Sequence, residues 1–279
     1  MVSEMSPDAI WSNYVKYIGA GAVAAGGIMS LIKSLPLIVK TFRDAVKGIG
    51  VKAGEINRQN KDISMKVVIG SIVVLAILMV VIPAIPLNPI GAIIVIIFGF
   101  FFATVSSRMV GLIGSSNNPV SGMTIATLLL ATSVLKATGN IGTQGMIAAI
   151  AIGSIICIST AIAGDTSQDL KTGYLVGASP YRQQIGEVIG VVASALAVGG
   201  VLYLLNSAWG YGGKELPAPQ ATLMKLVVEG VMNGNLPWAL VFAGVFIAIV
   251  IEILGIPVLP FAVGLYLPIH LSVPMMVGG

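Results

Sequence analysis

The sequence predicts an all-α fold, a polytopic integral membrane bundle of helices. Hydrophobic residues make up 56% of the chain and charged residues 9%, whereas soluble domains carry about 25% charged residues. The apolar runs recur at about 20 residues, the length at which a helix crosses a bilayer, and they lack the alternation of barrel strands. The 34 glycines and 14 prolines are typical of membrane helices, and they favour broken or re-entrant elements.

The apolar runs predict about eight membrane segments in one transmembrane domain, residues 1–279. Connections are mostly short, so neighbouring segments should be antiparallel. The last segment contains four prolines, and because proline removes a helical hydrogen bond, we expect a broken helix there. The expected segments are 15–39, 66–85, 90–113, 120–137, 144–163, 184–205, 237–254 and 256–277.

Lysines and arginines predict the orientation of these segments. The stretch 40–66 holds seven basic and three acidic residues, whereas 83–89 and 138–143 hold none. Because cytoplasmic loops carry the excess of Lys and Arg, we expect 40–66 in the cytoplasm and the chain in the inner (cytoplasmic) membrane. Its central part, 41–64, is then a cytoplasmic basic connector that also meets anionic lipid headgroups. Alternation places 114–119 and 164–183 in the cytoplasm, and 83–89, 138–143 and 206–236 outside.

Small residues recur four apart on two of the expected helices. Such rows let helix backbones approach closely, because packing drives association between membrane helices. We therefore expect tight helix contacts at both rows. They are Ala22, Gly26, Ser30 and Ser34 in the first segment, and Gly186, Gly190 and Ser194 in the sixth.

A polar stretch without charge, 114–123, separates two apolar runs. Asn118 followed by Pro119 predicts a helix start, because the Asn side chain caps free N–H groups and Pro at the first position needs none. One interpretation is an unwound hairpin whose helix N-terminus binds a carboxylate-bearing substrate. The alternative is an ordinary turn between helices. The substrate-path candidates are Asn117, Asn118, Ser121 and Thr124.

The stretch 164–183 is the polar segment richest in distinctive side chains. Gly164 suits the end of the fifth segment, and Asp165 with Gln168 resembles a capping box that begins a short cytoplasmic helix. One interpretation is a cytoplasmic gate or proton relay on Asp165 and Asp169; the other is a solvated loop whose charges set topology. The residues of this cytoplasmic signature are Asp165, Gln168, Asp169, Lys171 and Tyr174.

Ionisable residues inside the apolar segments are stronger indicators of function. Each costs about 2.5–3.5 kcal/mol at the centre of a membrane helix. Glu187, Arg108 and Glu252 are shallow in their segments, while His270 is deeper and Lys33 lies in the first segment. Glu187, His270 and Glu252 are candidates for proton coupling, since histidine exchanges a proton near neutral pH. The alternatives are side chains that reach the interface, or a structural hydrogen bond for His270.

Other classes of function have weaker support. Ser121 and His270 could form a dyad, but Pro119 stands where a serine nucleophile turn needs glycine. No His/Glu cluster could hold zinc, and the single Cys157 suits a packing role. No basic run is interleaved with aromatic residues. We therefore expect no enzymatic activity, no cofactor, no bound metal and no nucleic-acid partner.

Two runs carry a family resemblance. AGDTSQDLKTGYLVGASPYRQQIG (163–186) and GLIGSSNNPVSGMTIATLLLA (111–131) resemble the oligopeptide transporter (OPT) family, whose plant yellow-stripe-like branch carries metal chelates. QDLKTGYL followed by a Ser-Pro pair is the most specific part. The flanking sequences resemble prokaryotic members as well. Members of the family are longer, with about twice as many spans, so the chain resembles their later, C-terminal-side portion only.

The resemblance implies a secondary active transporter, a proton-coupled symporter of oligopeptides or peptide-like metal chelates. The alternative is a truncated or split half-transporter that acts only as a structural subunit with a partner membrane chain. The implied partners are the substrate, protons, membrane lipid, and a second copy or a partner half. Because the sequence shows neither a carboxylate clamp nor a metal-ligand cluster, peptide and chelate both stay open.

Overall fold

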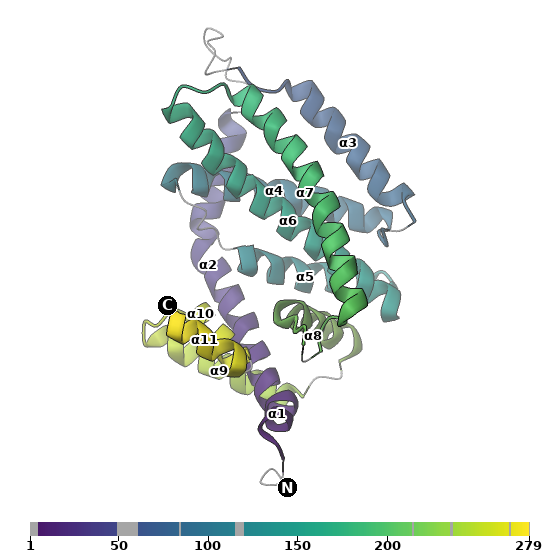
Figure 1. Ribbon diagram of the computed structural model, residues 1–279, viewed down its shortest axis with the longest axis vertical. Coiled ribbons are helices and arrows are strands. Elements are labelled where there is room, and N and C mark those ends of the chain that lie inside the picture. The colour runs from purple at the N-terminus through teal and green to yellow at the C-terminus, as the bar shows by residue number, and fades with distance from the viewer. Residues whose placement is uncertain are drawn as a thin grey trace. The chain divides into compact units, whose positions relative to one another are not determined.

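The computed structural model describes the backbone of residues 5–48, 61–83, 85–114, 120–213, 215–234, 237–267 and 269–278. This part of the chain is helical and contains no β-strand, which confirms the all-α fold class (Figure 1). The elements are α1 (Pro7–Ile10), the π-helical turn η2 (Trp11–Val15), α2 (Lys16–Gly48), α3 (Met65–Val81), α4 (Pro89–Ile113), α5 (Val120–Ala137), α6 (Gly142–Leu175), α7 (Pro180–Ala208), α8 (Pro219–Asn233), α9 (Trp238–Ile253), α10 (Val258–Tyr266) and α11 (Ile269–Gly278).

Helices α4, α6 and α7 are long and apolar enough to cross a membrane, and α3, α5 and α9 are shorter apolar helices. The expected segments 90–113 and 120–137 match α4 and α5 to within one residue. The expected break in the last segment is confirmed, since α10 ends at Tyr266 and α11 begins at Ile269 (Figure 1).

Two of the expected connections contain helical residues. α2 passes Pro36 and continues to Gly48, so the first part of the 41–64 connector is helical, and 49–60 lies outside the described residues. The expected external connection 206–236 contains the amphipathic helix α8. The sequence did not predict this helix, because it has too few apolar residues to be recognised as a membrane segment.

The chain forms two compact units. Unit 1 comprises Met1–Ser34, Ser121–Ile150 and Pro219–Gly279, and unit 2 comprises Leu35–Val120 and Ala151–Ala218. Helices α2 and α6 each contribute one part to each unit. The packing within each unit determines where the polar side chains lie.

In unit 1, α2 packs closely against α9. A Cβ atom added at Gly244 of α9 would contact the carbonyl oxygen of Ile18, so the two backbones touch at this point. Further along both helices, Lys33 forms an ion pair with Glu252. Contacts therefore advance in the same direction on the two helices, which means that α2 and α9 are parallel.

Helix α10 packs on α2 in the opposite direction. A Cβ at Gly19 would contact the backbone of Tyr266, and a Cβ at Gly26 would lie 2.9 Å from Cγ1 of Val258. Contacts thus move back along α10 as they advance along α2. Gly26 belongs to the first row of small residues, and its buried contact confirms that this row allows close helix packing.

Tyr266 joins several elements of unit 1. Its side chain is 1% exposed, and its hydroxyl donates a hydrogen bond to the carbonyl oxygen of Pro219 at 2.8 Å. The indole of Trp11 donates to the backbone oxygen of Tyr266 at 3.1 Å. The end of α10 is therefore tied to η2, α2 and α8, and its polar atoms are satisfied in an apolar interior.

In unit 2, α4 and α6 are parallel neighbours. A Cβ at Gly91 would lie 3.2 Å from Cδ1 of Ile152, and hydrogen bonds join the two helices further along both of them. Ser106 Oγ donates to the carbonyl oxygen of Thr160 at 2.7 Å. The parallel direction agrees with the alternation that the sequence predicts for the third and fifth segments.

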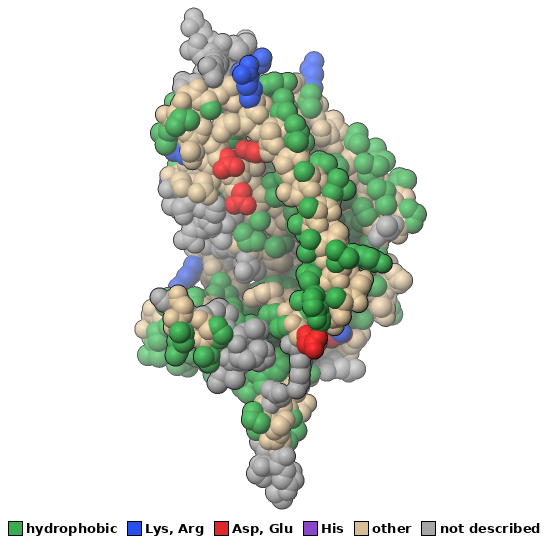
Figure 2. All heavy atoms as spheres, viewed as in Figure 1, with side chains coloured by type: hydrophobic (Ala, Val, Ile, Leu, Met, Phe, Trp, Pro, Cys, Tyr) green, Lys and Arg blue, Asp and Glu red, His purple; other side chains and the backbone are tan. Residues whose placement is uncertain are grey.

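Helices α3 and α7 leave broad apolar surfaces open in unit 2. No residue of either helix is fully buried within the described chain, and Figure 2 shows hydrophobic side chains along α7. A Cβ added at Gly186 or Gly190 would meet no described atom within 4 Å. The tight packing expected at the second row of small residues is therefore not found within this part of the structure.

We predict that Gly244→Ala destabilises unit 1 by about 1–3 kcal/mol, because the new methyl group forces the backbones of α2 and α9 apart. The measurement is the temperature at which the detergent-solubilised chain loses its monodisperse elution peak. The matched control is Gly264→Ala in α10, where an added Cβ meets nothing within 4 Å. The control should be neutral or slightly stabilising, and equal losses in both variants would contradict the packing described.

Candidate functional site

The polar stretch after the fifth apolar run continues as helix. α6 extends from Gly142 to Leu175 without interruption, so the helix end expected at Gly164 and the capping-box start expected at Asp165 and Gln168 are both wrong. Glycine weakens a helix by only about 1 kcal/mol, and Gly164 is buried in the packed helix. The turn comes later, at Gly177, which has a φ of 78°.

Serine side chains join the polar part of α6 to α4. The hydroxyls of Ser107 and Ser167 lie 2.5 Å apart, and Gly111 of α4 lies opposite the same serine. These contacts are interhelical hydrogen bonds between apolar helices, which hold membrane helices in one register. They explain why α6 remains helical beyond its apolar run: α4 continues beside it.

The first two turns of α7 pack against the last turns of α6. The Nε2 amide of Gln183 donates to the backbone oxygen of Asp169 at 3.1 Å. A Cβ at Gly173 would contact the Gln183 amide, so the absence of a side chain there makes room for it. The two helices form an antiparallel hairpin closed by polar contacts.

Glu187 lies one turn further along α7 and faces α6. Thr166 donates a hydrogen bond to its carboxylate, and the charge of Asp169 lies nearby. The Oε1 atoms of Glu187 and Gln183 are buried and accept no hydrogen bond within the described part of the chain. Figure 2 shows acidic side chains gathered on this face of unit 2. The result is a small, acceptor-rich polar site inside an apolar helix pair.

The residues just before α3 form hydrogen bonds with the first turn of α7, next to the turn that joins α6 to α7. The backbone N–H of Tyr181 donates to the carbonyl oxygen of Lys61 at 3.0 Å, and Lys61 Nζ lies 5.2 Å from the centre of the Tyr181 ring. The N–H of Ile63 donates to Oε1 of Gln184 at 3.3 Å. The start of α7 is therefore fixed between α6 and the segment that leads into α3.

The structure brings together only part of the predicted signature. Asp165, Asp169, Lys171 and Tyr174 are exposed on α6, and Gln168 is partly buried on the same helix. Of these residues, Asp169 is the one for which the structure describes a contact with α7, through its backbone oxygen and Gln183, and its charge also acts on Glu187. The role of the signature as gate or relay stays a prediction.

The substrate-path candidates are described in part. Asn117 and Asn118 lie outside the described residues, and α5 begins directly after them at Val120. Ser121 lies in the first turn of α5, and Thr124 is buried in the same helix at 6% exposure. His270 lies in α11. None of these placements tests the predicted contact with substrate.

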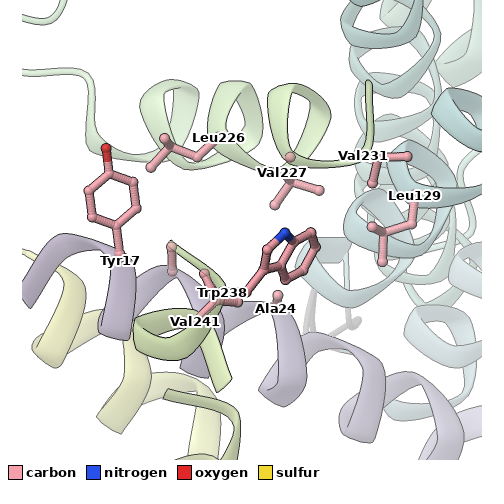
Figure 3. Close-up of a pocket in the computed structure, with 11 residues that line it drawn as sticks. Tyr17, Ala24, Leu129, Leu226, Val227, Val231, Trp238 and Val241 are labelled. Atoms are coloured by element: carbon pink, nitrogen blue, oxygen red, sulfur yellow. The ribbon is translucent and has the colours of Figure 1, made fainter. Parts of the chain in front are cut away.

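An apolar cavity of about 120 Å³ lies in unit 1 among α2, α5, α8 and α9. Figure 3 shows the indole of Trp238 inside it, between the aliphatic side chains of α8 and the helix α2. The indole N–H donates to the backbone oxygen of Gly234 at 3.2 Å. The cavity offers apolar contact and no charge. The residues labelled there are Tyr17, Ala24, Leu129, Leu226, Val227, Val231, Trp238 and Val241.

A second, more polar cavity of about 410 Å³ lies further along α2 and α9, and the Lys33–Glu252 ion pair lines it. The sequence indicated each residue separately but not their pairing. Opposite charges at similar depth in two segments of the same direction are the signal that could have predicted it. Glu252, a proton-coupling candidate, therefore has a basic partner.

Metal ligands are not clustered in the described residues, which contain no group of three or more His, Cys, Asp or Glu side chains able to hold an ion.

Apolar helices of membrane length that meet through a few polar contacts define a multi-pass membrane protein. The chain belongs to the OPT oligopeptide transporter family, whose model matches residues 1–279. It is 32% identical to a Haemophilus influenzae protein named "Putative oligopeptide transporter", over 96% of this chain and 50% of that protein. The chain thus spans about half the length of that relative.

Plant relatives match shorter regions. The chain is 31% identical to the rice (Oryza sativa subsp. japonica) "Probable metal-nicotianamine transporter YSL10", over 39% of this chain and 16% of that protein. It is 35% identical to the Arabidopsis thaliana "Probable metal-nicotianamine transporter YSL8", over 32% of this chain and 13% of that protein. No solved structure matches the chain. The resemblance inferred from the sequence is confirmed at the level of the family.

We predict that Gly173→Leu separates the ends of α6 and α7, because the new side chain occupies the space of the Gln183 amide. The expected loss is about 1–3 kcal/mol, measured as a lower midpoint of thermal unfolding in detergent. Thr172→Leu is the matched control, since Thr172 is exposed and bonds only its own helix in the described structure. A control shift as large as that of Gly173→Leu would contradict the role of the hairpin contact.

Proposed function

We propose that the chain is a secondary active transporter, a proton-coupled symporter of oligopeptides or peptide-like metal chelates across the cytoplasmic membrane. Family membership supports transport, and the names of the relatives supply the two substrate classes. The observation that supports proton coupling is the Glu187 carboxylate between α6 and α7, whose Oε1 is buried and which lies within the electrostatic influence of Asp169.

The polar site suits the exchange of a proton. A buried acceptor without a donor costs about 1–3 kcal/mol, and Oε1 of Glu187 is such an atom within the described chain. Protonation turns this oxygen into a donor and removes the charge that faces Asp169. Because Thr166, Gln183 and Glu187 supply the polar contacts between α6 and α7, the proton changes the contact that closes the hairpin.

The second candidate is a half-transporter that acts only as a structural subunit with a partner membrane chain. One observation favours it: α3 and α7 contain no fully buried residue in the described chain and leave apolar surfaces open. In this reading the same α6–α7 site works only when another membrane chain completes the bundle.

Uptake by proteoliposomes under an imposed proton gradient tests the proposal. We expect accumulation of a short peptide such as trialanine, or of an iron or nickel chelate, that disappears when the gradient is collapsed. Uptake that is indifferent to the gradient for every active substrate would show that proton coupling is wrong. Absence of uptake together with obligatory co-purification of a second membrane protein would favour the half-transporter instead.

The Glu187→Gln variant tests the residue itself. Glutamine keeps the shape and the hydrogen bond with Thr166 but binds no proton, so gradient-driven uptake should fall about tenfold or more, equivalent to about 1.4 kcal/mol. The control is Glu229→Gln in α8, a glutamate that pairs with Lys225 near the surface of unit 1. If the gradient dependence of Glu187→Gln equals that of the parent chain, Glu187 has no part in coupling.

A further inference from the structure

The Lys33–Glu252 pair lies against the larger cavity of unit 1. Gly26 and Ser30 line it from α2, residues 255–257 line it from the turn between α9 and α10, and residues 258–260 line it from the first turn of α10. Two opposite charges on apolar helices are costly to retain. They are placed where a molecule can enter beside them, since the Lys33 side chain is 67% exposed and that of Glu252 25%.

The start of α10 adds a second source of positive potential to the same cavity. The first amides of a helix have no carbonyl partner within the helix, and the helix dipole makes this end positive. Pro257 and Pro260 have no N–H, so the N–H groups at the start of α10 without a partner within the helix are those of Val258 and Leu259, two residues that line the cavity. Lys33 and the α10 N-terminus thus both favour an anion.

Glu252 is the negatively charged residue among those that line the cavity. Lys33 from α2 is the titratable group that faces it, and the described lining residues of the turn and of α10 are uncharged. The pair is therefore balanced when the cavity is otherwise empty. A ligand carboxylate entering the cavity would compete with Glu252 for the same ammonium group.

We propose that this cavity is a carboxylate site, in which Lys33 and the N-terminus of α10 bind a carboxylate of the ligand and Glu252 is the internal anion it displaces. The assignment of the ligand as a peptide or chelate carboxylate rests on the proposed function.

The test is equilibrium binding of radiolabelled trialanine and of its C-terminal amide to the full chain in nanodiscs. The parent chain should prefer the free acid. Lys33→Gln should abolish this preference and weaken trialanine binding about tenfold or more, while Lys33→Arg should keep the preference.

Glu252→Gln removes the competing carboxylate, so trialanine should bind several-fold more tightly and binding of the amide should be unchanged. Lys225→Gln and Glu229→Gln, which break an exposed ion pair of the same unit, are the matched controls.

The proposal is overturned if Lys33→Gln lowers the unfolding temperature but leaves the acid-over-amide preference intact, because the pair is then structural only. It is also overturned if neither the parent chain nor Glu252→Gln binds the free acid. The proposed function fails separately. Lys33-dependent binding without any proteoliposome uptake keeps the site and rejects the transporter, whereas uptake with an unchanged preference in Lys33→Gln keeps the transporter and rejects the site.

Discussion

The close approach of α2 to α9 is the contact on which unit 1 depends. Between membrane helices no hydrophobic effect favours association, so packing and polar contacts must supply it. Gly244 lets the two backbones touch at one end of the helix pair. Because the two helices are parallel, Lys33 of α2 lies opposite Glu252, about two turns beyond Gly244 on α9. The glycine contact therefore sets the geometry of the charged cavity.

In unit 2, hydrogen bonds from hydroxyl and amide side chains hold the apolar helices together. Ser106 and Ser107 of α4 bond to α6, and Gln183 and Glu187 of α7 bond to the last turns of that helix. No residue of α7 is fully buried in the described chain. The hydrogen bonds that hold α7 to its neighbours gather near its start, and Glu187 takes part in them.

The sequence predicts the helices better than their partners. Apolar length and proline positions were enough for α4, α5 and the break between α10 and α11, since both depend on local chemistry. The helix end predicted at Gly164 was wrong, because a single glycine does not end a helix that packs against a neighbouring helix, as α6 packs against α4. The Lys33–Glu252 pair was not predicted, because it joins residues more than two hundred positions apart and depends on which helices pack. The site residues near Asn118 stay predictions.

Helix directions connect the two candidate sites with the predicted orientation. Within unit 1, α9 is parallel and α10 antiparallel to α2, and within unit 2, α4 and α6 are parallel; all agree with the alternation expected from the basic loops. That alternation assigns Lys33, Glu252 and Glu187 to the cytoplasmic ends of their helices. Charges near a helix end reach the interface at lower cost than charges at the centre. The predicted orientation therefore places both carboxylates where a charge costs less than at the centre of the membrane.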